Sequence, residues 1–183
     1  MEPIFSLPYS EYMVANEILK LLPRNQGYAA YLPFSRQQKG VDFIIVKGGK
    51  HATVQVKASR SYEGYAGQRC QYSLWFHNFL APPFTLHADF YCLFSIYPDV
   101  TESKKQQKVK WTPIMLCFSS NDIEEMRRKR IFRQAKNGGS SRFMYVEFDN
   151  PKHPFATRGF IKSQDWSRYI LRANIDAISN CLS

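Results

Sequence analysis

The chain has 183 residues, of which 44% are hydrophobic, so it can build one domain with a sizeable core and is not collagen-like, disordered or a disulfide scaffold. It has no run of 18 apolar residues, no basic and apolar leader, and four cysteines without a C-x-x-C pair. We therefore expect a cytoplasmic protein with reduced thiols, no membrane partner and no zinc site. The 25 Lys and Arg residues outnumber the 15 Asp and Glu residues and give a net charge of +10, which favours a polyanionic partner.

The first half of the chain predicts one helix followed by strands. Val14, Ile18 and Leu22 share one helical stripe, which predicts a helix over residues 10–22. Later segments rich in β-branched and aromatic residues predict strands, and the last two of these are expected to be neighbours in one sheet. The predicted strands cover residues 28–34, 41–46, 52–58, 72–79, 88–97 and 112–118.

The second half of the chain predicts a basic helix, a loop and a further strand. Asn121 and Asp122 are expected to cap a helix that carries the basic cluster at residues 127–130. Residues 136–141 have the composition of a loop, and residues 142–148 have that of a strand. Together with the first half, this order predicts a mixed α/β protein.

A closing helix is predicted over residues 164–182 because apolar residues recur there at helical spacing. The chain shows no internal repeat and no low-complexity linker, so we expect a single domain over residues 1–183 with its core at about residues 10–97. The predicted apolar face of the closing helix consists of Trp166, Ile170, Ala173 and Ala177.

The positive charge is concentrated in one quarter of the chain. Residues 101–142 contain 11 Lys and Arg residues and four Asp and Glu residues, a net charge of +7, whereas residues 1–100 have a net charge of +2. This region is either a solvated basic loop and helix face or a surface that contacts nucleic acid. The candidate DNA-binding residues in it are Lys104, Lys105, Arg127, Arg128, Lys129 and Arg130.

Gly48 and Gly49 separate two apolar runs and predict a tight hairpin turn. In the resulting register the numbers of paired residues sum to 97, so Asp42 lies opposite Gln55 and Lys57 follows on the same face. Cross-strand partners have Cβ atoms roughly 4.5–5.5 Å apart, so these polar groups should converge. The opposite face is expected to be core and consists of Val41, Phe43, Ile45, Ala52, Val54, Val56 and Ala58.

A carboxylate, an amide and an ammonium group on one face suit a phosphodiesterase that uses a divalent metal. Mg²⁺ prefers oxygen ligands, which Asp42, the Gln55 amide and the Val56 backbone carbonyl can provide. Lys57 can orient the attacking water, accept its proton or stabilise the charged transition state. Glu17, at the edge of the first helix, is either a metal contact or a surface residue paired with Lys20.

Glu17 and the segments 40–46 (GVDFIIV) and 54–59 (VQVKAS) resemble the PD-(D/E)XK nuclease superfamily. This family includes type II restriction enzymes, archaeal Holliday-junction resolvases, Mrr-type nucleases and some homing endonucleases. The resemblance covers roughly residues 10–97 and implies a three-layer restriction-endonuclease-like fold, with a central mixed β-sheet flanked by helices. It also implies hydrolysis of DNA phosphodiester bonds with Mg²⁺, for which Mn²⁺ can substitute.

The same resemblance implies metal-binding and catalytic roles for Asp42, Gln55 and Lys57, and Glu17 matches a helix glutamate found in many members. Two residues depart from the family pattern. Val41 stands where the family has proline, and Gln55 replaces an acidic residue as in Q-x-K subgroups. The loss of one negative charge weakens the expected metal site unless Glu17 restores it.

Polar residues beside the proposed site are either phosphate contacts or parts of solvated loops; these are Ser35, Arg36, Lys39, Ser59 and Arg60. Because cleavage of both strands of double-stranded or branched DNA generally needs two sites, we expect a homodimer or homotetramer. Three other functions are consistent with the sequence. They are a catalytically inactive DNA-binding module on the same fold, a subunit that binds an acidic protein, and a nuclease that acts on RNA.

Overall fold

The computed structural model describes residues 6–32, 40–59, 70–77, 85–99, 110–129, 133–134, 142–156 and 164–183. Among the described residues no helix is both long and apolar enough to cross a membrane. The helices and strands are α1 (Ser6–Leu21), η1 (Arg24–Gln26), β1 (Ala29–Tyr31), β2 (Phe43–Lys47), β3 (Lys50–Ser59), β4 (Tyr72–His77), β5 (Phe90–Asp99), β6 (Lys110–Ser119), α3 (Ser120–Arg128), β7 (Arg133–Gln134), β8 (Arg142–Phe148), β9 (Phe155–Ala156), β10 (Gln164–Asp165), η2 (Ser167–Tyr169) and α4 (Ile175–Cys181).

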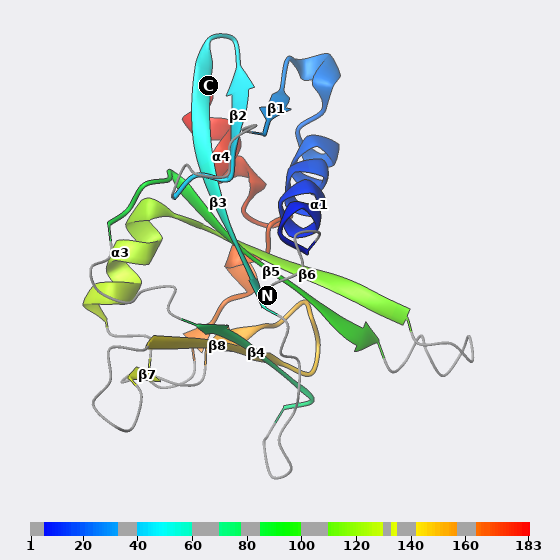
Figure 1. Ribbon diagram of the computed structural model, residues 1–183, viewed down its shortest axis with the longest axis vertical. Coiled ribbons are helices and arrows are strands. Elements are labelled where there is room, and N and C mark those ends of the chain that lie inside the picture. The colour runs from blue at the N-terminus through cyan, green and yellow to red at the C-terminus, as the bar shows by residue number, and fades with distance from the viewer. Residues whose placement is uncertain are drawn as a thin grey trace.

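The central sheet has five strands in the order β1-β2-β3-β5-β6 (Figure 1). All neighbours are antiparallel except β3 and β5, which run parallel. The sheet is therefore mixed, and the predicted α/β class is confirmed. The prediction that the strands at 88–97 and 112–118 are neighbours is also confirmed, because β5 and β6 pair along their whole length.

Helices α1 and α4 cover one face of the central sheet. The predicted stripe of α1 is buried there, with Val14 and Ile18 fully enclosed against Val54 and Val56 of β3. Because a helix with one apolar stripe needs a surface to bury it, α1 packs where the hairpin presents its valines. The helix begins at Ser6, four residues before the predicted start.

The opposite face of the central sheet is covered by a second sheet and by α3. The second sheet has the order β10-β9-β8-β4, with β7 beside β8, and lies below the central sheet in Figure 1. Leu74 of β4 and Val146 of β8 enter the core between the sheets, where they pack with Leu93 and Leu116. The expectation of a sheet flanked by helices therefore holds on one face, while the other layer is mainly β-structure.

The predicted closing helix over residues 164–182 is wrong. The segment forms β10, η2 and the short α4, and it crosses from one core to the other. Trp166 is buried between the sheets, whereas Ile178 lies in the core under α1. Between them the Leu171 N–H donates to the Met115 carbonyl of edge strand β6 at 2.9 Å. A continuous helix could not enter both cores and also bond to this edge.

The start of α3 also differs from the prediction. Ser119, rather than Asn121 or Asp122, is the N-cap. Its hydroxyl accepts the Asp122 N–H at 3.2 Å, and the Asp122 carboxylate accepts the Ser119 N–H at 2.9 Å. This capping box satisfies two N–H groups at the helix start, which explains why α3 follows β6 without a loop.

Candidate functional site

The β2–β3 hairpin has the predicted register. Phe43 pairs with Val54 and Lys47 pairs with Lys50, so the numbers of paired residues sum to 97. Gly48 and Gly49 both have positive φ values, of 54° and 86°. Two consecutive positive φ values are typical of the tight turns that match the twist of paired strands, and they favour glycine. The diglycine turn therefore fixes which residues of β3 lie beside Asp42.

Asp42 lies directly before β2 and is bonded to β3 through both its backbone and its side chain. Its N–H donates to the Val54 carbonyl at 2.9 Å, and its Oδ2 atom accepts the Val56 N–H at 2.6 Å. The carboxylate thus provides an acceptor at the point where the backbone ladder of β2 ends. Burial raises the pKa of the Asp42 carboxyl, and the opposing effects of the Val56 hydrogen bond and the Lys57 charge are smaller.

Gln55 and Lys57 lie on the face of β3 that is turned toward the second sheet. They pair with Tyr91 and Leu93 of the parallel strand β5, and both of these β5 side chains belong to the core between the sheets. Both polar side chains are half-buried. Asp42 is therefore bonded to Val56, which Gln55 and Lys57 flank on β3, and the charge of Lys57 acts on the Asp42 carboxyl. The ladder of β2 and β3 ends at Phe43 and Val54, so the predicted pairing of Asp42 with Gln55 is not part of it.

The apolar face of the hairpin is shorter than predicted. Phe43, Ala52 and Val54 are fully buried under α1, but Ala58 is exposed. Val41 packs instead in the core between the two sheets. Its alternation with Phe43 is broken because Gly40 has a positive φ of 95° and the chain bends before β2 begins.

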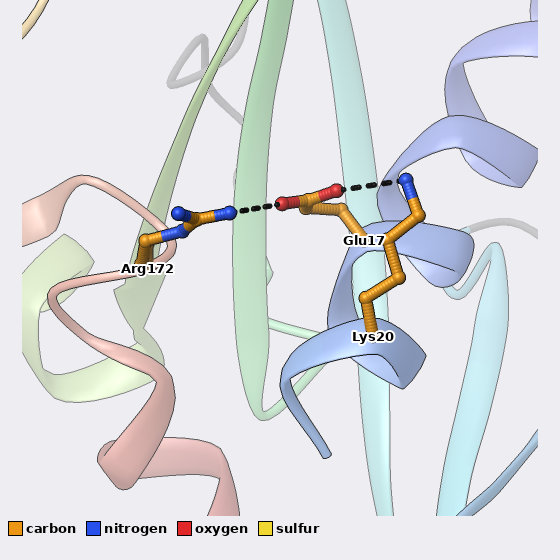
Figure 2. A network of polar contacts seen from close by, with 3 residues as sticks. All are labelled: Glu17, Lys20 and Arg172. Atoms are coloured by element: carbon orange, nitrogen blue, oxygen red, sulfur yellow. Dashed lines mark hydrogen bonds and ion pairs between the residues drawn. The ribbon is translucent and has the colours of Figure 1, made fainter. Parts of the chain in front are cut away.

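Glu17 lies in an ion-pair network on α1. Its two carboxylate oxygens contact Lys20 Nζ at 3.2 Å and Arg172 Nη2 at 3.3 Å (Figure 2). The pairing with Lys20 that the sequence offers is present, and Arg172 comes from the segment before α4. Helix α1 covers the sheet face that carries Val54 and Val56, so Glu17 and Lys57 belong to different layers. None of the contacts found among the described residues joins Glu17 to Asp42.

We expect Glu17→Gln to lower the free energy of unfolding by about 0.2–1 kcal/mol, the usual range for exposed ion pairs. The Glu17 side chain is 25% exposed and that of Arg172 is 76% exposed, so solvent screens the pair. Urea unfolding of Glu17→Gln, Arg172→Ala and the double variant measures the coupling. If Glu17→Gln reduced DNA cleavage as strongly as a substitution of Asp42, Glu17 would have to be a metal contact.

The DNA-binding candidates beside the site are only partly described. Ser59 is buried, and its hydroxyl donates to the Trp75 carbonyl of β4 at 2.7 Å, so this side chain links the two sheets. Ser35, Arg36, Lys39, Arg60, Lys104, Lys105 and Arg130 lie outside the described residues.

The candidate cations of α3 are balanced by acids on the same helix. Arg127 contacts Glu124 at 2.9 Å, Lys129 pairs with Glu125, and Arg128 is exposed. Residues 120–129 contain as many acidic as basic residues, because Asp122 adds to these two glutamates. The net positive charge of residues 101–142 therefore comes from other parts of that region.

His87 is a neighbour of the site that the sequence did not indicate. A Cβ atom placed on Gly40 would lie 2.5 Å from His87 Cβ and 2.8 Å from its ring. The exposed His87 side chain therefore packs directly on the glycine two residues before Asp42. Only the parallel pairing of β3 with β5 brings these residues together, and no local pattern in the sequence reports that pairing.

Among the described residues, no group of three or more His, Cys, Asp or Glu side chains is arranged to hold a metal ion. For a metal bound beside the Asp42 carboxylate, the Gln55 amide and the Val56 carbonyl of β3 are the candidate further oxygen donors. Comparisons of the chain with protein-family models, curated proteins and solved structures return no match.

Proposed function

We propose that the protein is a Mg²⁺-dependent DNA endonuclease with a restriction-endonuclease-like fold. The observation that carries the proposal is the contact between Asp42 Oδ2 and the Val56 N–H at 2.6 Å. It holds the carboxylate beside the strand that contains Gln55 and Lys57. These are the residue types, on adjacent strands, that resemble the PD-(D/E)XK site.

The oxygen donors at this point fit a hard divalent cation. One oxygen of Asp42 accepts from Val56, and no hydrogen bond to the other is found among the described residues. The N–H and C=O groups of one strand residue point to the same edge, so the Val56 carbonyl faces the side on which Asp42 lies. With the amide oxygen of Gln55, these groups are the ligands that Mg²⁺ prefers.

Mg²⁺ at this position would polarise a phosphoryl oxygen and stabilise negative charge in the transition state. Asp42 would hold the ion, and Lys57 would orient the attacking water or stabilise the developing charge. Burial favours both roles because charges interact more strongly where water is excluded. Because burial raises the pKa of the metal-free Asp42 carboxyl, protons should compete with the metal for this group at a higher pH than for an ordinary aspartate.

The order of elements supports the fold assignment. A helix is followed by three strands that pair antiparallel in the central sheet, and after β4 the strand β5 joins this sheet in parallel to β3, which gives the mixed central sheet that the resemblance implies. The second sheet opposite α1 is a departure from a layer made of helices. We propose that it is an addition that supports the site, since β4 is bonded to the end of β3 through Ser59 and Trp75.

A catalytically inactive DNA-binding module is the second candidate. Two observations favour it: Glu17 is held by Lys20 and Arg172, and one oxygen of Asp42 is already used by the backbone of Val56. The site then has a single carboxylate and weaker attraction for a divalent cation. Such a module would bind DNA equally well in Mg²⁺ and in EDTA.

We expect the wild type to cleave DNA in Mg²⁺ or Mn²⁺ and to be inactive in EDTA. The substrates to compare are duplex, branched and single-stranded DNA, together with RNA of the same sequence. Lys57→Ala should lower the cleavage rate by about 10²-fold or more, because a charge that stabilises the transition state is lost. If the wild type left every substrate intact, and Lys57→Ala bound DNA as tightly as the wild type, the protein would be the catalytically inactive DNA-binding module.

DNA binding and assembly are proposed on the same basis. The net charge of +10 would attract the phosphate backbone, and exposed Arg128 is the described cation of α3 best placed to contact it. Two copies would cut the two strands of a duplex. Light scattering with and without DNA tests whether a homodimer or homotetramer forms.

A further inference from the structure

The β2–β3 hairpin is a basic part of the molecule that lies wholly within the described residues. From Phe43 to Ser59 it contains three lysines and no acidic residue, a net charge of +3. Helix α3, by contrast, carries three acidic and two basic residues. Two of the three hairpin lysines, Lys47 and Lys50, lie at the turn. We call residues 47–51 (KGGKH) the hairpin tip.

The hairpin tip projects from the body of the molecule. In Figure 1 the turn between β2 and β3 is at the top of the molecule, beyond α4. A Cβ atom added to Gly48 or Gly49 would have no neighbour within 4 Å among the described residues. Lys50 and His51 are exposed. The tip is therefore open to a ligand as large as a nucleic acid.

Two positive charges are held together at this turn. Lys47 and Lys50 lie directly opposite each other in the ladder. Like charges at paired positions of antiparallel strands repel, which lowers stability. Lys47 is fixed there, because its Nζ atom donates to the Tyr28 hydroxyl at 3.0 Å and lies 4.4 Å from the centre of the Tyr28 ring. An unfavourable local pairing of this kind is expected at functional sites, where a ligand of opposite charge offsets the repulsion.

The Tyr28 contacts also tie the tip to the rest of the protein. The Tyr28 ring is buried, and its hydroxyl lies 2.8 Å from Ser179 Oγ of α4. The base of the tip is thus bonded through Tyr28 to the helix beside it. A charge held in this way loses less conformational freedom when a ligand binds.

The tip offers cations but no exposed aromatic ring. Sites for single-stranded nucleic acid combine cations with aromatic side chains on which bases stack, and residues 46–51 contain no aromatic residue. Lysine binds phosphate as a point charge, and contacts with phosphates do not depend on base sequence. A two-stranded β-ribbon also has the width to enter the major groove of a duplex. These properties favour the backbone of double-stranded DNA over an unpaired strand.

We infer that the hairpin tip binds the phosphate backbone of a DNA duplex, with Lys50 contacting a phosphate and Lys47 adding to the positive potential. The inference rests on the nucleic-acid partner of the proposed function but does not require cleavage. His51, next to Lys50, shares a face of β3 with Gln55 and Lys57, because side chains alternate along a strand. His51 and Lys57 are six residues apart in β3. This separation is about 20 Å, or about six base-pair steps. A duplex lying along this face would meet the tip about six base pairs from the bond beside Lys57.

Fluorescence anisotropy of a labelled duplex in EDTA tests the inference without cleavage. We expect Lys50→Ala to weaken binding by about 8-fold at 0.1 M salt and to lower the slope of log Kd against log salt by about 0.9, the values for one lost phosphate contact. The loss should be the same for duplexes of unrelated sequence. Lys50→Arg should retain the affinity. Lys152→Ala is the matched control, since Lys152 is an exposed lysine between β8 and β9 of the second sheet.

Urea unfolding separates a binding role of Lys50 from a structural one. Because Lys50→Ala removes the repulsion with Lys47, it should unfold at the same urea concentration as the wild type or at a higher one. A variant that bound duplex less tightly and also unfolded more readily would assign Lys50 to the stability of the hairpin and overturn the inference.

Equal duplex affinity of Lys50→Ala and the wild type would overturn the inference, as would a wild type that binds no duplex. Polyglutamate that bound the wild type as tightly as the duplex does would instead assign the tip to an acidic protein. The proposed function fails separately, if the wild type leaves every substrate intact. A wild type that cleaves DNA while Lys50→Ala binds normally would disprove only the site at the hairpin tip.

Discussion

Asp42→Asn is expected to reduce metal-dependent DNA cleavage by at least about 10²-fold, because it removes the carboxylate on which the proposed metal site depends. The substitution keeps the shape of the side chain and an oxygen that can accept the Val56 N–H. Loss of activity can therefore be separated from loss of structure. Initial rates on duplex and branched DNA, over a range of Mg²⁺ concentrations, measure the effect.

The same variant should be at least as stable as the wild type at neutral pH. Since burial raises the pKa of Asp42 in the folded state, its protonated form favours folding. The stabilisation by protonated Asp42 is fully present below the pKa of aspartate in the unfolded chain, about 3.9, and is lost as the pH rises through the pKa of Asp42 in the folded protein. Asp42→Asn never carries the buried charge. The difference in unfolding free energy between this variant and the wild type should therefore shrink as the pH falls from the folded pKa to the unfolded pKa.

Urea unfolding in EDTA at neutral and acidic pH measures this difference. A variant that is markedly less stable than the wild type at neutral pH would mean that Asp42 is chiefly a structural residue. Cleavage by the wild type should also decline on the acidic side at a pH above the ordinary range of aspartate. Unchanged cleavage by Asp42→Asn would rule out Asp42 as the metal-binding carboxylate.

Gly40→Ala is expected to lower the free energy of unfolding by about 2–4 kcal/mol. Two effects add at this position. The φ of 95° is unfavourable for any residue with a Cβ, and that atom would lie 2.5 Å from His87 Cβ. Relief of the clash would move the segment that leads into Asp42, so cleavage should fall together with stability. Urea unfolding and cleavage rates provide both readouts.

Gly27→Ala is the matched control for backbone strain. Gly27 has a φ of 85°, but nothing lies within 4 Å of an added Cβ. Its substitution should cost about 1 kcal/mol, which is the strain without the clash. His87→Gly should recover part of the stability lost in Gly40→Ala. Equal losses in Gly40→Ala and Gly27→Ala would contradict the packing of His87 on Gly40.

The hairpin and the first helix could be predicted because their signals are local. The spacing of Val14 and Ile18 reports a stripe on one helix, and Gly48-Gly49 reports a turn whose geometry fixes the register of both strands. From this register Asp42 could be placed next to β3, although its contacts there are with the backbone of Val54 and Val56 and not with Gln55 in the ladder. The strands β5 and β6 could be predicted equally well, because each contains a run of buried residues, Phe90–Ser95 in β5 and Ile114–Phe118 in β6.

The features that were missed depend on contacts between distant segments. Helical spacing over residues 164–182 was overridden because Trp166 and Ile178 belong to two separate cores. The pairing of Glu17 with Arg172 joins residues 155 positions apart. His87 approaches Gly40 only because β5 adds in parallel to β3. The sequence also did not show that a second β-sheet covers the face of the central sheet opposite α1. Strands such as β4 and β8 can pack on any apolar sheet face, so their sequences do not specify which face they cover.

Mn²⁺-induced broadening of backbone amide signals in the NMR spectrum tests the proposed metal site most directly. The Val56 amide is the best reporter, because it donates to the carboxylate that would hold the ion. We expect Mn²⁺ to broaden Gln55, Val56 and Lys57 selectively in the wild type and to leave them sharp in Asp42→Asn. Broadening centred on Glu17, or the same broadening in both proteins, would contradict a metal site at Asp42.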